Sequence, residues 1–200
     1  MFNPGQYSRR QMMARMAAGL TAVAAADAQH VHEQVTQEKT AAKGPYKPKA
    51  LTAHEYATVQ KLSDLIIPAD EHSPGALAAN SAEFIDFLCN AADEMKNIWT
   101  GGILWLDEEM NRRYGGKQFV DAAPTQQTAM LDLIAYRKNR SPELNPGIDF
   151  FAFCRRLVAD AYYTHPIGIK DVGYMGNAAM ASFSVPKEAL DYAMKRSGLG

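Results

Sequence analysis

Residues 149–163 read DFFAFCRRLVADAYY. Apolar side chains recur in this stretch every three or four residues, which places them along one face of an α-helix. They are Phe150, Phe153, Cys154, Leu157, Val158 and Ala161. A stripe of this kind must be covered by other elements, because an isolated helix of this length is only marginally stable in water. The segment therefore predicts an amphipathic helix that packs into a larger assembly of elements.

Comparable helical patterns occur on both sides of this segment. Thr52-Ala-His-Glu55 forms a capping box that opens a helix, and Pro68 ends that helix. Further helices are predicted from Ser81 to Ala92, from Trp99 to Tyr114 before Gly115-Gly116, from Pro124 to Ala135, and from Pro186 to Lys195. No segment alternates with the period of a β-strand. We expect an all-α fold in which residues 51–200 form a single compact domain of five to six helices.

Composition is that of one globular domain. The chain has 200 residues, of which 47% are hydrophobic and 22% charged, and its formal net charge of −1 provides no overall attraction for nucleic acid. Its two cysteines lack C-x-x-C spacing, which excludes zinc ribbons, iron–sulfur clusters and covalently attached haem. In an oxidising compartment Cys89 and Cys154 could form a disulfide, and otherwise they are two buried thiols. The sequence leaves both alternatives open.

The N-terminus has the anatomy of an export signal. Arg9 and Arg10 precede an alanine-rich run of eleven residues, 16–26, and Ala26-Asp27-Ala28 has the pattern of a signal-peptidase site. The run is too short to span a membrane, which takes about 20 apolar residues. Paired arginines in this position look like the twin-arginine signal, which a receptor reads as an address. We expect residues 1–28 to direct the chain to the periplasm, and the polar residues 29–50 to form an extended arm.

Motifs for chemistry are incomplete throughout the chain. His32-Glu33 and His54-Glu55 begin like the zinc-protease motif H-E-x-x-H, but Thr36 and Thr58 occupy the place of the second histidine. Residues 168–173 have the glycine spacing of a phosphate-binding loop without its lysine and hydroxyl residue. Dinucleotide-binding and nucleophile-elbow motifs do not occur. We therefore predict no catalytic, cofactor-binding or metal-ligating residue in this chain.

Residues 162–177 predict an irregular C-terminal loop rich in tyrosine and glycine. Ordering so many glycines is costly in backbone entropy unless other groups hold them. The segment is either a loop packed on its own domain or a contact surface, since tyrosines combine a large apolar area with a polar hydroxyl. The candidate interface residues are Trp105, Tyr162, Tyr163, His165, Gly168, Gly173, Tyr174, Gly176 and Asn177.

Several of these stretches carry a family resemblance. They are Leu51-Thr-Ala-His-Glu55, Leu62-Ser-Asp-Leu-Ile-Ile-Pro68, Ser73-Pro-Gly-Ala76, Glu83-Phe-Ile-Asp86, Tyr162-Tyr-Thr-His-Pro-Ile-Gly168 and Gly173-Tyr-Met-Gly-Asn177. In this order they resemble the gluconate 2-dehydrogenase subunit 3 family, although Met175 stands where the family usually has a proline. The resemblance implies a small, helical, non-catalytic subunit of a periplasmic dehydrogenase complex.

The resemblance also implies the partners. They are a large flavoprotein of the glucose-methanol-choline oxidoreductase type, which holds FAD and oxidises a sugar, sugar acid or glycoside, and often a c-type cytochrome that carries haem c. Because the twin-arginine route exports folded proteins and this chain itself shows no cofactor site, we hypothesise that it stabilises the flavoprotein and escorts it through export.

Two alternatives come from other classes of protein. The chain could be an autonomous periplasmic enzyme that uses Asp70, His72 or His165 as acid–base groups. It could also be a module that binds small ligands between its helices. Turnover by the isolated chain would favour the first alternative, and stabilisation by a ligand would favour the second.

Overall fold

The computed structural model describes residues 25–42, 44–174 and 185–197, and within these ranges the regular structure is entirely helical. The α-helices are α2 (Ala25–Ala41), α3 (Ala53–Ile66), α4 (Gly75–Ala78), α5 (Ser81–Ala91), α6 (Asp93–Tyr114), α7 (Pro124–Ala135), α8 (Asn145–Tyr163), α9 (Pro166–Asp171) and α10 (Lys187–Ser197). Two short 3₁₀ helices, η1 (Phe119–Asp121) and η2 (Arg137–Asn139), flank α7. The all-α prediction is confirmed.

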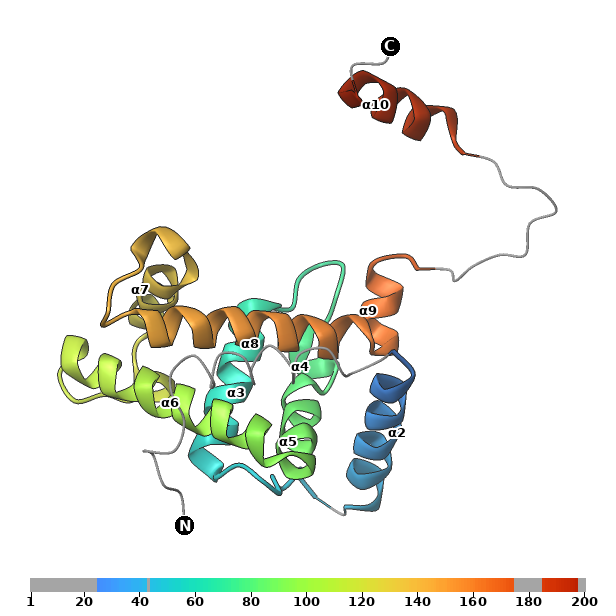
Figure 1. The fold of residues 1–200 in the computed structure, drawn as a ribbon. Helices are drawn as coiled ribbons and strands as arrows, with labels where there is room; N and C mark the ends of the chain where they lie inside the picture. The colour runs from blue at the N-terminus through green and yellow to red at the C-terminus, as the bar shows by residue number, and fades with distance from the viewer. Residues whose placement is uncertain (1–24, 43, 175–184, 198–200) are drawn as a thin grey trace.

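Helix α8 is the element around which the others are arranged. It packs against α3, α4, α5, α6, α7 and α9, and Figure 1 shows it running along the length of the body. The apolar stripe predicted from the sequence is buried along its whole length. We use the term body for α2 to α9. Helix α10 lies apart from the body in Figure 1 and has no buried residue.

Several predicted helix boundaries are confirmed. Thr52 caps α3 through its side chain, and Glu55 returns the bond to the backbone N–H of Thr52, so the capping box is complete. Gly115 ends α6 in the left-handed conformation, with φ of 72°, and Pro124 opens α7. Side-chain capping and backbone geometry therefore act locally here, as the sequence indicated.

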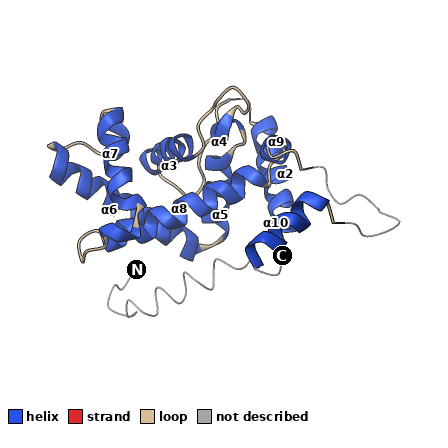
Figure 2. Cartoon of the chain, turned by 90° about the horizontal axis from the view of Figure 1, so that it is seen from above, coloured by secondary structure: helices blue, strands red, loops and turns tan. Residues whose placement is uncertain are grey.

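The predicted extended arm over residues 29–50 is wrong in its first half. Residues up to Ala41 form α2, which packs against α5 (Figure 2). Val31 and Val35 are buried together with Ala28, so three small apolar side chains one helical turn apart make the contact. The many charged residues between them conceal this stripe in the sequence. Only the segment after α2, residues 44–51, is free of helix.

A buried carboxylate fixes the path of that segment. Asp86 on α5 accepts hydrogen bonds from the Tyr46 hydroxyl at 2.8 Å and from the backbone N–H groups of Lys49, Ala50 and Leu51 at 2.7, 3.1 and 2.9 Å. A buried charge is tolerated only when such bonds replace its hydration. Burial, followed by the bond to Asp86, raises the pKa of Tyr46 far above its ordinary value. Asp86 therefore delivers the chain to the start of α3.

Helices α6 and α8 approach each other closely through glycines. A Cβ atom at Gly102 would lie 2.0 Å from a ring carbon of Phe150, and one at Gly147 would lie 2.0 Å from a ring carbon of Trp105. Trp105 was among the predicted interface residues, but its ring packs on Gly147 of α8 and it is only partly exposed. It belongs to the α6–α8 contact.

The cysteines are two buried free thiols, so the disulfide alternative is not realised in the structure. Burial raises the pKa of Cys89 to about 12 and that of Cys154 well above its ordinary value. Thiols of this kind are poor nucleophiles and pack as small apolar groups. In the described part of the chain, no helix is long and apolar enough to cross a membrane.

The neighbouring glycines of α6 should respond in opposite directions to alanine. Gly102→Ala inserts a methyl group into the Phe150 ring and should lower the free energy of unfolding by about 1–3 kcal/mol. Gly101 is exposed and a Cβ there meets nothing within 4 Å, so Gly101→Ala should raise stability by roughly 0.5–1 kcal/mol through helix propensity. Urea unfolding followed by circular dichroism measures both. Equal effects would contradict the proposed close approach.

Candidate partner interface

The corner between α8 and α9 contains most of the predicted interface residues. The irregular loop expected over residues 162–177 is wrong for its first ten residues, because α8 continues to Tyr163 and α9 begins at Pro166. His165 caps α9 by accepting a hydrogen bond at Nδ1 from the N–H of Ile167, at 3.2 Å. Pro166 in the first turn suits a helix start, so the signal was present in the sequence.

Tyr162 is the buried centre of this corner. Its hydroxyl donates to Asp171 Oδ2 at 3.0 Å, and it forms a short hydrogen bond with Ser73 Oγ. Since the phenol has a single proton, Ser73 is the donor in the second bond. Gly168 packs against the Tyr162 backbone so closely that a Cβ would lie 2.1 Å from the carbonyl oxygen. Tyr162 and Gly168 therefore hold the corner together from inside and are not surface contacts.

This network joins two stretches that carry the family resemblance, residues 73–76 and 162–168. Ser73 and Tyr162 are 89 residues apart in the sequence. Ser73 Oγ also accepts from the N–H of Gly75 at the start of α4, at 3.2 Å. The resemblance thus rests largely on residues that build one joint between the turn before α4 and the α8–α9 corner.

Helix α2 closes the corner with a second histidine. His32 Nε2 lies 2.9 Å from Thr164 Oγ1, and Thr164 itself donates to the carbonyl oxygen of Asp160, so His32 is the donor at Nε2. Its ring meets that of His165 edge-on, with centroids 5.0 Å apart. Burial, and then repulsion from His165, lowers the pKa of His32 to about 4, and burial also lowers the pKa of His165. Both imidazoles are neutral at neutral pH.

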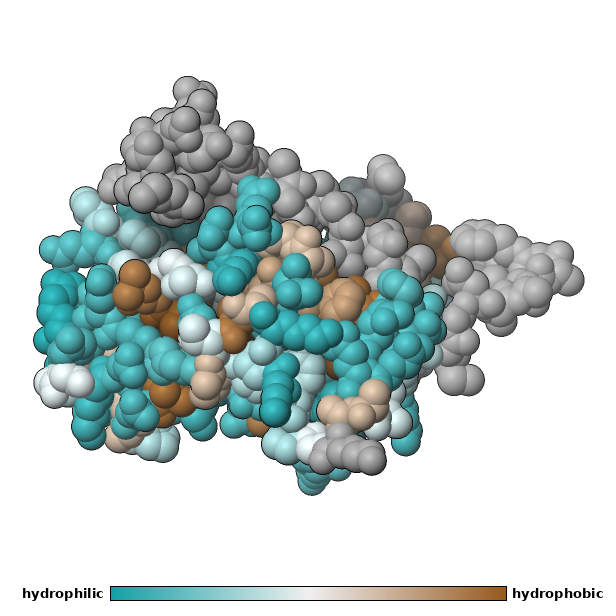
Figure 3. Space-filling view, turned by 90° about the horizontal axis from the view of Figure 1, so that it is seen from below, coloured by the Kyte–Doolittle hydropathy of each residue, from teal (hydrophilic) through white to brown (hydrophobic). Residues whose placement is uncertain are grey.

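The outer side of the corner presents apolar and aromatic groups to solvent. Tyr163 is 46% exposed, Val172 58% and Tyr174 62%. We call these three residues the aromatic corner. The Tyr163 ring packs edge-on against buried Tyr162, with centroids 4.9 Å apart, so its exposed side is held in place from below. Figure 3, by comparison, shows a face of the molecule that is mostly hydrophilic with small separate apolar areas.

The remaining predicted residues have mixed outcomes. Gly173 is exposed and has a φ of 64°, a conformation that favours glycine. Gly176 and Asn177, and the signal residues Arg9 and Arg10, lie outside the described residues. Of the predicted cleavage site, Ala26 and Ala28 lie in α2, and Ala28 is buried.

The residues suggested for acid–base chemistry have local structural roles. Asp70 accepts from the N–H groups of His72 and Ser73, both at 2.8 Å, and these bonds lower its pKa. His72 is exposed beside Glu71, and His165 caps α9. An aspartate that closes a turn in this way is a common structural motif.

Sequence reasoning missed one carboxylate–histidine pair. His54 Nε2 lies 2.6 Å from Asp107 Oδ2, and the other oxygen of Asp107 accepts from the N–H of Phe119 at 2.8 Å. The pair connects α3, α6 and η1. Its partners are 53 residues apart, and no local pattern in the sequence links them. Because Asp107 also holds the backbone of η1, the pair has a structural role in joining these elements.

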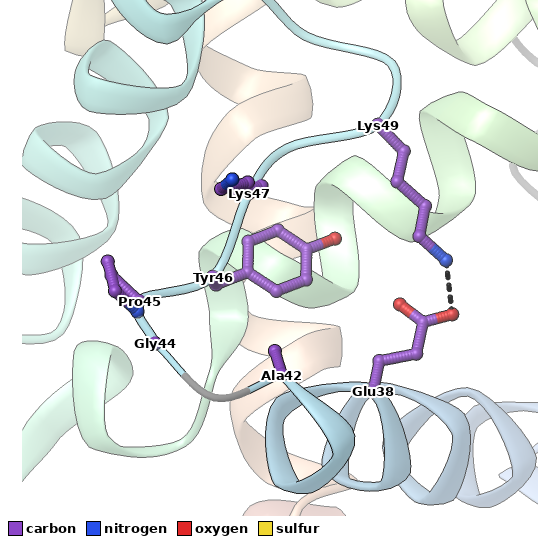
Figure 4. Close-up of a pocket in the computed structure, with 7 residues that line it drawn as sticks. All are labelled: Glu38, Ala42, Gly44, Pro45, Tyr46, Lys47 and Lys49. Atoms are coloured by element: carbon purple, nitrogen blue, oxygen red, sulfur yellow. Dashed lines mark hydrogen bonds and ion pairs between the residues drawn. The ribbon is translucent and has the colours of Figure 1, made fainter.

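The largest hollow is of a different kind from the aromatic corner. It has a volume of about 400 Å³ and lies between the end of α2 and the segment that follows. Figure 4 shows the Tyr46 ring beside it and Lys49 reaching Glu38, with which it forms an ion pair of 2.5 Å. Its charged side chains are thus paired with each other. Among the described residues there is no group of three or more His, Cys, Asp or Glu side chains that could hold a metal ion.

Comparison with known families agrees with this architecture. The family model for gluconate 2-dehydrogenase subunit 3 matches residues 53–181, which include the joint and the aromatic corner. The chain belongs to the gluconate 2-dehydrogenase subunit 3 family, and it is therefore of the class of small subunits of dehydrogenase complexes. Comparisons with curated proteins and with solved structures give no match.

The buried histidines predict acid sensitivity. Between pH 6.5 and about 4 the unfolded chain binds a proton at His32 that the folded chain excludes, so stability should fall as the pH falls through this window. The lowered pKa corresponds to a loss of roughly 3 kcal/mol at the acid end. His32→Leu should flatten this part of the profile, measured as urea stability against pH.

His30→Gln provides the matched control, because His30 is exposed on the same helix. It should keep the wild-type profile. Carboxylates with a lowered pKa, such as Asp70 and Glu55, also lose stabilisation in acid, so the informative quantity is the difference between each variant and the wild type. Parallel profiles for His32→Leu and the wild type would refute the assignment.

Proposed function

We propose that the chain is the non-catalytic small subunit of a periplasmic complex whose catalytic subunit is an FAD-containing flavoprotein of the glucose-methanol-choline type. The reaction of the complex would be oxidation of a hydroxyl group of a sugar, a sugar acid or a glycoside. A c-type cytochrome with haem c would serve as electron acceptor in a third subunit. Flavin chemistry belongs to the partner in this proposal, and the small subunit supplies a folded docking surface.

The observation that carries the proposal is the relation between the joint and the aromatic corner. The family match includes buried residues that hold Tyr163 and Tyr174 at the surface without covering them. Tyrosines that are rigid on one side and exposed on the other are favoured anchors at protein interfaces, because little side-chain entropy is lost when they are buried. This arrangement supports a docking role for the corner.

The proposed role includes stabilisation and export of the flavoprotein. A subunit that binds only the folded partner stabilises it by mass action. The twin-arginine pattern at Arg9 and Arg10 would then export the two proteins together after FAD has been incorporated in the cytoplasm. This explains why a chain with no apparent cofactor site would use a route for folded proteins.

Loss of the corner tyrosines should weaken the complex. Tyr163→Ala combined with Tyr174→Ala should raise the Kd for the flavoprotein at least about tenfold, since two interface anchors are removed. Both residues are exposed, so the stability of the isolated chain should change by only about 0.5 kcal/mol. Titration of the purified flavoprotein, followed by calorimetry, measures the effect.

Tyr136→Ala is the matched control. This tyrosine is 54% exposed and follows α7, at the far end of α8 from the corner (Figure 1). It should leave the Kd unchanged. If the corner variant bound as tightly as the wild type, the docking surface would lie elsewhere.

Export of both proteins should depend on the paired arginines. Arg9→Lys with Arg10→Lys preserves charge but removes the guanidinium groups, and it should retain both the small subunit and the flavoprotein in the cytoplasm. Cell fractionation with immunoblotting of both proteins measures this. Arg15→Lys, in the same N-terminal segment, is the control and should export normally. Continued export of the flavoprotein without its small subunit would exclude the escort role.

A further inference from the structure

Helix α10 has two faces with different chemistry. Its sequence, KEALDYAMKRS, places Leu190, Ala193 and Met194 on one side, at the i, i+3 and i+4 spacing of a helix stripe. Leu190 is 52% and Met194 42% exposed. Every described residue from 185 to 197 is exposed. An apolar stripe of this kind is left uncovered by the body.

The other side of α10 is already paired within the helix. Lys187 forms an ion pair of 2.5 Å with Asp191, one turn away. Arg196 donates to the Tyr192 hydroxyl at 2.7 Å, and its guanidinium lies 5.6 Å from the centre of the same ring. The polar groups of α10 therefore satisfy one another, whereas the apolar stripe has no partner. Such a helix is suited to recognition through its apolar side.

The described part of the body offers no apolar groove to receive the stripe. Its two hollows are lined by charged or hydroxyl-bearing side chains, including Glu38 and Lys49 in one and Thr125 and Asp132 in the other. Its exposed large apolar residues are divided among separate elements. Packing of α10 against its own body would leave the stripe poorly covered.

A second copy of the chain is also a poor occupant. Two facing helices of 11 residues, each contributing Leu190 and Met194 as large apolar groups, fall well short of the roughly 1,200 Å² that a specific interface buries. A lipid surface is disfavoured because Glu188 and Asp191 lie on the polar side, where anionic headgroups favour basic residues. A groove on another protein remains as the occupant that covers the whole stripe.

We infer that α10 docks as a helix into an apolar groove of the catalytic flavoprotein subunit, with Leu190, Ala193 and Met194 as the anchors. This rests on the proposed function, and it specifies a second point of attachment with its own mode of recognition. Because the charged side of α10 is internally paired, binding through this helix depends on apolar contact and hardly on salt. The aromatic corner and α10 then grip the partner at two places along one chain, and each raises the effective concentration of the other.

The test uses the full-length chain and the co-expressed, purified flavoprotein. Leu190→Ala with Met194→Ala removes the anchors but keeps the helix, because alanine is the best helix former. It should raise the Kd at least about tenfold. Lys187→Ala with Asp191→Ala is the matched control on the polar side and should change the Kd less than about threefold. Raising the salt from 0.05 to 0.5 M should shift the wild-type Kd by less than about threefold.

Hydrogen exchange identifies the occupant. The amides of α10 should exchange freely in the isolated chain and become protected when the flavoprotein is added. Unchanged affinity of the Leu190→Ala, Met194→Ala variant, with a wild-type complex still formed, would overturn this inference alone. Protection in the isolated chain, self-association lost in that variant, or binding of the chain to phosphatidylglycerol vesicles through α10 would overturn it in favour of another occupant. Failure of the wild-type chain to bind the flavoprotein would overturn the proposed function as well.

Discussion

The hydrogen bonds of the Tyr162 hydroxyl connect parts of the chain that are distant in sequence. Through Ser73 and Asp171 the hydroxyl joins the turn before α4, the end of α8 and the end of α9. A buried hydroxyl must keep such partners, because losing them costs roughly 1–3 kcal/mol. The position of Tyr163 at the surface follows from this joint, since the two tyrosines are adjacent and their rings touch. The buried network thus determines what the outer surface can present.

Local signals in the sequence were sufficient to predict most helices of the body. The capping box at Thr52, the left-handed Gly115 and Pro124 at a helix start act within a few residues of where they stand. Helix α2 was missed because its stripe is narrow and consists of small residues between charged ones. Its stability comes from packing on α5, and tertiary packing of this kind is not visible in a local pattern.

The candidate interface was only partly predictable for a similar reason. Tyrosine composition indicated the right region, but alternate burial along α8 decided that Tyr162 points inward and Tyr163 outward. Trp105 looked like an anchor because it is large, yet Gly147 on a distant segment makes room for its ring. The His54–Asp107 pair likewise depends on residues brought together by the fold. Which large side chain faces solvent is therefore a property of the assembled helices.

Asp86 has a consequence for how freely the neighbouring segment can change during evolution. Three of the four groups that bind this carboxylate are main-chain N–H groups, contributed by consecutive residues from Lys49 to Leu51. Main-chain donors are the same for every amino acid except proline. The clamp thus recognises the course of the chain and is indifferent to side-chain identity at positions 49 and 50. Drift in this stretch is compatible with an unchanged fold, provided that proline stays out.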